Sequence, residues 1–261
     1  MDGVMSDSAS EGCGALRIRL LACEVFCREV CSLASASPTT CDVEFLPKGL
    51  HDLGSDRMLA HLQARVDAAG GGYDAVALVY GLCNNGVVGL KARDVKLVIP
   101  KAHDCMTLFM GDRRRYRAYF EAHPGTYYRT SGWFEHNRSD GTGEQTVSQR
   151  LGLFQAFGEL VEKYGEENAR YIQEILGNGV VNYDRLTYID MGLPRDAHFR
   201  QQAVAEAAER GWAFDSVMGS LELMRKLLDG QWDDDFIMVP PGHVLQASYA
   251  HPDEMMRVSP G

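Results

Sequence analysis

The sequence lacks any long apolar run. Stretches such as Ala75–Tyr80 contain only a few residues, whereas a helix that spans a bilayer needs about 20 apolar residues. The amino terminus is small, polar and acidic, without the basic start and apolar core of a secretion signal. These features argue against a membrane-spanning or exported chain, and we expect a cytoplasmic protein.

Positive charge is scarce. The chain has 26 Lys and Arg residues against 36 Asp and Glu residues, which gives a formal net charge of −10. Binding to the phosphates of nucleic acids requires a basic surface, as does docking on anionic lipids. We therefore expect no nucleic-acid partner and no membrane partner, and a small molecule is the expected ligand.

Several common catalytic motifs are missing. The chain has no GxSxG elbow, no P-loop and no dinucleotide-binding GxGxxG, so a serine hydrolase, a P-loop NTPase and an ordinary NAD enzyme are not expected. Seven cysteines are present, an odd number in a chain too long to need a disulfide framework. The alternative to a disulfide framework is that these cysteines are reduced thiols that bind a metal or act in catalysis.

Apolar runs alternate with helical patterns along most of the chain, which predicts an α/β protein. We expect two Rossmann-like lobes with mostly parallel sheets and a site at the carboxyl ends of the strands. The expected divisions are a disordered lead-in (1–14), an amino-terminal lobe (15–134), a linker or mobile loop (135–147), and helices followed by a carboxyl-terminal lobe (148–250). The last strand of that second lobe is expected at Phe236–Val239.

Side chains that bind soft metals follow several of the expected strands. They are Cys23, His51, Cys83, His103 and Cys105. Open α/β sheets bind ligands at the carboxyl ends of their strands, so parallel strands would bring these side chains to one edge. His243 follows the last expected strand and is a further candidate by position alone.

Thiolate and imidazole together favour zinc or iron. The expected metal ligands are Cys83, His103 and Cys105, with Cys23 or His51 completing or flanking the set. In an extended segment, His103 and Cys105 would face the same way, with Asp104 as an orienting group or a catalytic base. His51 is the second expected catalytic group. The alternatives are a helix cap for Asp104, small buried core residues for the cysteines and an exposed loop position for His51.

Five residues are expected to contact a cofactor or substrate. They are Asn84, Asn85, Arg113, Tyr127 and Tyr128. The asparagines lie in a turn whose backbone could approach a ligand, and Arg113 opens the only run of three basic residues, which could bind a carboxylate or a phosphate. The two tyrosines could form the walls of a pocket together with Trp133. The alternative for the arginines is a solvated helix face, and for the aromatic residues a place in the core.

Three motifs carry a family resemblance: YGLCNNGVVGL, LVIPKAHDCMTLFMG and PGTYYRTSGW. With the later stretch GWAFDSVMGSLELMRKLLDGQWDDDFIMVPPGH, they resemble the bacterial and archaeal family of domain of unknown function 1638, over roughly residues 16–245. The resemblance implies that the family's cysteine and histidine positions fall on Cys23, His51, Cys83, His103 and Cys105. It implies no established activity. An association with corrinoid-dependent methylamine metabolism suggests one-carbon chemistry, with a corrinoid as a second cofactor and a corrinoid protein or methyltransferase as a partner.

Three functions follow as hypotheses. The leading one is a metalloenzyme that acts on a small molecule, with methyl or one-carbon transfer as the reaction. The second is a non-catalytic protein that binds and delivers a corrinoid or a metal cofactor. The third is a metal-free enzyme in which Cys83 or Cys105 is the nucleophile and His103 the base.

Overall fold

The computed structural model describes residues 15–83, 85–136, 183–248 and 255–261, together with positions 161, 165, 166 and 170. The side chains of His51 and Asp52 are outside this description. So are the expected lead-in (1–14), most of the expected linker (135–147) and most of the helical region that follows it. In the part of the chain that is described, no helix is both long and apolar enough to cross a membrane.

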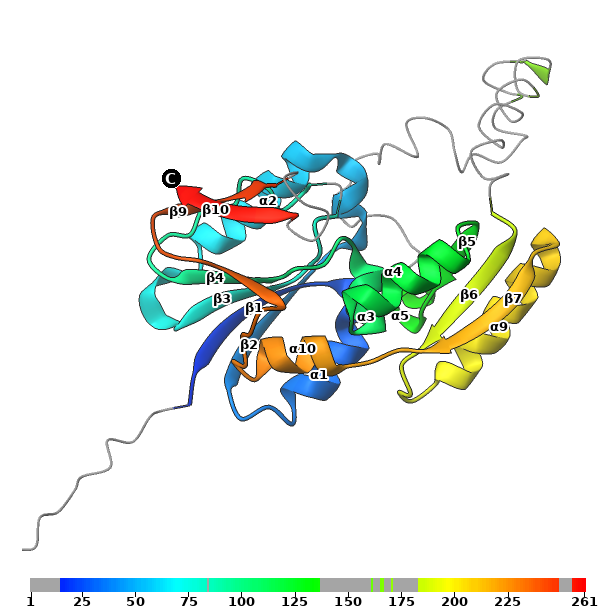
Figure 1. The fold of residues 1–261 in the computed structure, drawn as a ribbon, viewed down its shortest axis with the longest axis horizontal. Coiled ribbons are helices and arrows are strands. Elements are labelled where there is room, and N and C mark those ends of the chain that lie inside the picture. Colours follow the sequence, from blue (N-terminus) through cyan, green and yellow to red (C-terminus); the bar gives the residue numbers. More distant parts are fainter. Residues whose placement is uncertain are drawn as a thin grey trace, which may run out of the picture.

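A five-stranded sheet forms the centre of the molecule (Figure 1), with the strand order β2-β1-β3-β4-β8. The first four strands run parallel, and β8 is antiparallel to β4. The strands are β1 (Arg17–Cys23), β2 (Thr40–Leu46), β3 (Ala75–Val79), β4 (Lys96–Pro100) and β8 (Phe236–Val239).

Helices and a hairpin cover the two faces of this sheet (Figure 1). One face packs on α1 (Cys27–Ala34), α3 (Cys105–Met110) and α10 (Glu222–Leu228). The other face packs on η2 (Lys48–Leu53), α2 (Ser55–Asp67) and the hairpin β9–β10 (His243–Ala247, Met256–Pro260). Successive strand residues point to opposite faces, so Leu20 enters one apolar core and Leu21 the other.

A second, three-stranded parallel sheet stands beside the first, in the order β5-β6-β7. Its strands are β5 (Thr126–Arg129), β6 (Arg185–Asp190) and β7 (Ala213–Met218). Helix α9 (Asp196–Arg210) buries Phe199, Ala203 and Ala207 against it. The chain contains, in addition, α4 (Arg113–Ala122), α5 (Ser131–Glu135), and the short turns η1 (Glu24–Phe26) and η3 (Gly70–Gly72).

The α/β class and the mostly parallel sheets agree with the sequence prediction. One strand was assigned to the wrong lobe, because β8 (Phe236–Val239) pairs with β4 in the first sheet. Strand β5 was not predicted as a strand, and it pairs with β6 of the second sheet although it lies before residue 134. An apolar run fits the edge of either sheet, and only the path of the chain through space decides between them.

Gly132 brings α5 onto the central sheet. A Cβ atom at this position would collide with the carbonyl oxygen of Val25 in η1. The side-chain oxygen of Thr130 caps α5 by accepting a hydrogen bond from the Trp133 N–H, at 3.4 Å. The close approach therefore depends on glycine and places the Trp133 ring beside the end of β1.

We expect Gly132→Ala to destabilise the protein by about 1–3 kcal/mol, because overpacking of this size forces the backbone apart. Chemical denaturation measures the change. Gly71→Ala is the matched control, since a Cβ there meets nothing within 4 Å and the glycine has a φ of −84°. Equal stability of the two variants would contradict the close packing of α5 on η1.

Glu29, on α1, is a buried acid. Its side chain is fully inaccessible, and neither carboxylate oxygen has a hydrogen-bond partner among the described residues. Burial raises the pKa of Glu29 from 4.5 to about 7, and the negative charge of Asp196 adds to this rise. Between those pH values the folded state binds more protons than the unfolded state, so the free energy of unfolding falls as the pH rises.

We predict that Glu29→Met removes this pH dependence. The variant should gain up to about 3 kcal/mol over the original chain above pH 7, and the gain should shrink toward pH 4.5. Urea denaturation across that pH range measures it. Glu209→Met, at an exposed position of α9, is the control and should show no such trend. A gain that is independent of pH would show that Glu29 does not titrate in this range.

Candidate functional site: a three-cysteine pocket

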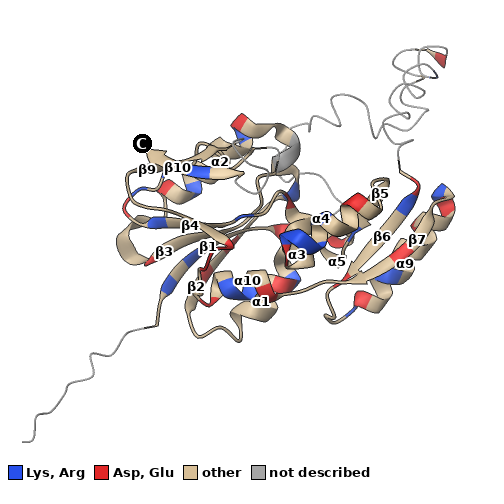
Figure 2. Cartoon of the chain, viewed as in Figure 1, with Lys and Arg blue, Asp and Glu red and all other residues tan. Residues whose placement is uncertain are grey.

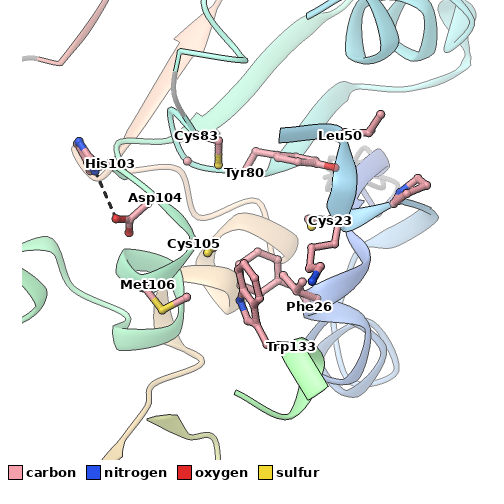
Figure 3. A pocket seen from close by; sticks show the side chains of 14 residues that line it. Cys23, Phe26, Leu50, Tyr80, Cys83, His103, Asp104, Cys105, Met106 and Trp133 are labelled. Atoms are coloured by element: carbon pink, nitrogen blue, oxygen red, sulfur yellow. Dashed lines mark hydrogen bonds and ion pairs between the residues drawn. The ribbon is translucent and has the colours of Figure 1, made fainter. Parts of the chain in front are cut away.

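A pocket of about 240 Å³ lies at the carboxyl ends of β1, β3 and β4 (Figure 3). Three cysteines from three separate segments line it. Cys23 is the last residue of β1, Cys83 lies in the loop after β3, and Cys105 is the first residue of α3, after β4. The structure therefore places these three predicted residues together, at the edge of the sheet where ligands of open α/β folds bind.

Backbone hydrogen bonds join the loops that carry two of these cysteines. The Leu82 N–H donates to the Ala102 carbonyl at 2.9 Å, and the Cys83 N–H donates to the His103 carbonyl at 3.2 Å. Cys83 has a φ of 46°, in the left-handed region that residues other than glycine rarely adopt. Such strain persists only where the surrounding contacts enforce it, and it is frequent at functional sites.

The pocket disfavours free thiolates. Burial raises the pKa of Cys23 and of Cys83 to about 12, and raises that of Cys105 well above its ordinary value. The negative charges of Cys83 and Cys23, when ionised, raise the pKa of Cys105 further. The positive charge of Lys48 and a contact with Trp133 act in the opposite direction on Cys23 and Cys105, with smaller effects. All three are therefore neutral thiols at pH 7 unless a cation joins them.

Tyr80 adds a polar group to this apolar space. Its side chain is 4% exposed and lines the pocket, and its hydroxyl has no hydrogen-bond partner among the described residues. Burial raises the pKa of this phenol well above 10, so the group keeps its proton. Buried hydroxyls are seldom left without a partner, and a ligand in the pocket would supply an acceptor.

His103 stands apart from the thiols. Its side chain is 72% exposed and lies at the far edge of the pocket, directed away from Cys105 (Figure 3). The prediction that the two side chains face the same way was wrong. Asp104 is extended but Cys105 already begins α3, so the alternation of side chains in a strand does not apply.

Asp104 caps helix α3 and contacts several other side chains. Its carboxylate accepts from the Thr107 N–H at 3.2 Å and from the Tyr116 hydroxyl at 3.0 Å, and its Oδ2 lies 3.3 Å from Nδ1 of His103. The contact with Asp104 raises the pKa of His103 above its ordinary value. Asp104 therefore contacts His103 and caps α3, which was the alternative role considered for it.

The other predicted residues lie elsewhere. Asn84 and the side chain of His51 are outside the described residues, and Asn85, with a φ of 65°, is exposed. Tyr127 and Tyr128 are on β5 and do not belong to the described lining of the pocket. Tyr127 packs against Trp212 with the Arg129 guanidinium over its ring, and Tyr128 packs against Tyr116. His243 begins β9, with its Nδ1 3.1 Å from the Pro241 carbonyl oxygen.

Two polar side chains that line the pocket, those of Tyr80 and Lys48, were not predicted. Tyr80 ends the apolar run of β3, and a tyrosine at the carboxyl end of a buried strand is a signal that the sequence offered. Lys48 follows β2, and its Nζ lies 4.6 Å from the centre of the Trp133 ring. Pro47 and Gly49 mark a turn after β2 in the sequence, but they do not indicate that the turn places Lys48 beside the thiols.

The predicted metal-ligand set is not assembled as a coordination shell. Among the residues that the structure describes, no three His, Cys, Asp or Glu side chains are arranged to hold a metal ion. His103 points away, and the three sulfur atoms surround the pocket without meeting at coordination distance. A metal at this site would require the cysteines to turn inward, and rotation about χ1 between staggered positions moves a sulfur in this way.

Comparison with known proteins gives one match. No curated protein and no solved structure matches the chain. A family described as "Protein of unknown function (DUF1638)" matches residues 45–228. This range includes Cys83, the segment from His103 to Cys105, and Trp133. Since the match covers more than half of the sequence, the chain belongs to the DUF1638 family.

Proposed function

We propose that Cys23, Cys83 and Cys105 bind a thiophilic metal ion, zinc or iron, and that the protein is an enzyme that uses it to act on a small molecule. The observation that carries this proposal is the convergence of three thiols, from three strand ends, on one pocket. Isolated core cysteines would explain each position separately, but they do not explain why all three line the same small space.

The chemistry of the donors supports a metal. Three thiols in a desolvated pocket hold their protons at neutral pH, and a divalent cation would supply the charge that allows them to ionise. Thiolates are the ligands that soft and borderline metals prefer. Three protein ligands leave one position open, which is typical of a catalytic zinc site.

The surrounding residues suit a small ligand at that open position. When bound, the metal would act as a Lewis acid or would lower the pKa of a ligand that it holds. The Tyr80 hydroxyl is a hydrogen-bond donor inside the pocket, and Trp133 and Phe26 give it apolar walls that exclude water. His103, held by Asp104 at the rim, can give or take a proton where the ligand enters.

Methyl or other one-carbon transfer is the reaction that we propose. The soft ligand set and the one-carbon association implied by the family resemblance are its support. A corrinoid carried in this pocket has less support, because about 240 Å³ is below the roughly 300–1,000 Å³ of pockets for drug-sized ligands. A corrinoid would then belong to a partner protein that presents it from outside.

The metal-free cysteine enzyme has less support than the metal site. A nucleophilic cysteine needs a lowered pKa or an adjacent base, whereas burial raises the pKa of Cys83 and His103 points away from Cys105. Neither requirement is met by the described residues.

We expect the purified protein to bind one Co²⁺ ion per chain, with a thiolate-to-metal absorption band in the near ultraviolet, and Zn²⁺ to displace it. Cys83→Ser and Cys105→Ser should each weaken binding more than about 100-fold, because each removes a ligand worth several kcal/mol. Cys31→Ser, at an exposed cysteine of α1, is the matched control and should bind as the original chain does. Binding that is absent, or unchanged in both pocket variants, would overturn the proposed site.

Alkylation by iodoacetamide separates the metal site from the metal-free alternative. At pH 8 the metal-free protein should be labelled first at exposed Cys31, and the three pocket thiols on the order of 100-fold more slowly, since few of them are ionised. Mass spectrometry of peptides over time gives the rates. Fastest labelling at Cys83 or Cys105 would instead favour a cysteine nucleophile.

A further inference from the structure

A second and larger cavity adjoins the three-cysteine pocket. It measures about 640 Å³, and His103 and Asp104 line both spaces. Its other wall is helix α4, which contributes Arg113, Arg114 and Arg117. A molecule in the larger cavity would therefore lie next to the entrance of the thiol pocket, with His103 between the two.

The three arginines share one side of α4. Arg113 and Arg117 are four residues apart and Arg114 and Arg117 three apart, which are the spacings of neighbours on a helix surface. Figure 2 shows the basic residues gathered at the start of this helix. In a chain with a net charge of −10, this is a local concentration of positive charge.

The position of this cluster is unfavourable for the helix itself. The amino-terminal turn of a helix carries a partial positive charge, which favours acidic side chains. Asp112 caps α4 by accepting a hydrogen bond from the Arg115 N–H at 2.7 Å, but the first turn itself contains arginines and no acidic side chain. Arg115 in the same turn has a structural role, because its guanidinium donates to the carbonyls of Met110 and Met218. That role does not extend to Arg114, whose side chain is exposed on the cavity wall.

The acidic groups of the cavity are already engaged. Asp104 accepts hydrogen bonds from Thr107 and Tyr116 and contacts His103, and Glu121 pairs with Arg117 at 2.8 Å. Three guanidinium groups line this wall of the cavity, and the side chain of Arg114 is exposed there. Guanidinium groups bind carboxylates and phosphates through paired hydrogen bonds.

We propose that this cavity binds the anionic end of the substrate, a carboxylate or a phosphate, on Arg113, Arg114 and Arg117. The exposed ring of Phe120 and the side chain of Met255 line the same space and would contact the carbon body of the molecule. The reacting end passes His103 into the thiol pocket. The placement of the reacting end rests on the proposed function, whereas the anion site itself does not.

Titration of the full-length, metal-free protein with inorganic phosphate and with acetate, at constant ionic strength, tests the anion site. Saturable binding is expected, weakened about 10-fold by Arg114→Gln, because one charge-assisted contact is lost. Arg200→Gln, at an exposed position of α9, is the matched control and should leave binding unchanged. Tighter binding of phosphate would assign a phosphorylated substrate, and tighter binding of acetate a carboxylated one. Lack of saturable binding, or equal affinity in the Arg114 and Arg200 variants, would overturn the proposal.

Comparison of iodoacetate with iodoacetamide tests the link between the two cavities. Both reagents form a carbon–sulfur bond as the thiolate displaces iodide, but only iodoacetate carries a carboxylate. The rate ratio of iodoacetate to iodoacetamide should be higher at Cys83 or Cys105 than at Cys31, and Arg114→Gln should lower it. An equal ratio at all sites would remove the link. Because neither experiment needs a metal, failure of the proposed metal site would leave both results interpretable.

Discussion

Contact between two loops, one after β3 and one after β4, determines the geometry of the candidate site. The loops are joined by hydrogen bonds from Leu82 and Cys83 to the carbonyls that precede Cys105. Their approach requires Gly81, because a Cβ there would lie 2.8 Å from the backbone of Asp104. With a larger residue the loops would separate, and Cys83 and Cys105 would no longer line one pocket.

The sequence predicted which strand ends carry the residues of the candidate site. Apolar runs located β1, β3 and β4, and the parallel α/β pattern implied that the residues after them share an edge. The sequence did not predict the direction of the His103 side chain. That direction depends on whether the residues after β4 continue the strand or start a helix. The helix starts here because Asp104 caps it, with Thr107 and Tyr116 in place as its hydrogen-bond partners. Nor did the sequence predict that β8 returns to the first sheet, since its four apolar residues are compatible with either sheet edge.

Two buried polar side chains lack hydrogen-bond partners, but only the one that lines a cavity is evidence for a binding site. Glu29 and Tyr80 are both nearly inaccessible, and neither has a hydrogen-bond partner among the described residues. Tyr80 faces a cavity that also holds three thiols, so a ligand can satisfy it. Glu29 is fully inaccessible and lines neither of the two cavities, and protonation is the means by which its burial is tolerated. The first is therefore evidence for a binding site, and the second is a cost to stability.

Asp104 contacts residues that line both cavities. One carboxylate caps α3, which begins with Cys105, accepts a hydrogen bond from Tyr116 of α4, and holds His103 between the two spaces. The position of Cys105 and the orientation of His103 therefore depend on the same carboxylate. An anion at the site proposed on α4 would lie beside this carboxylate, because Asp104 lines both cavities.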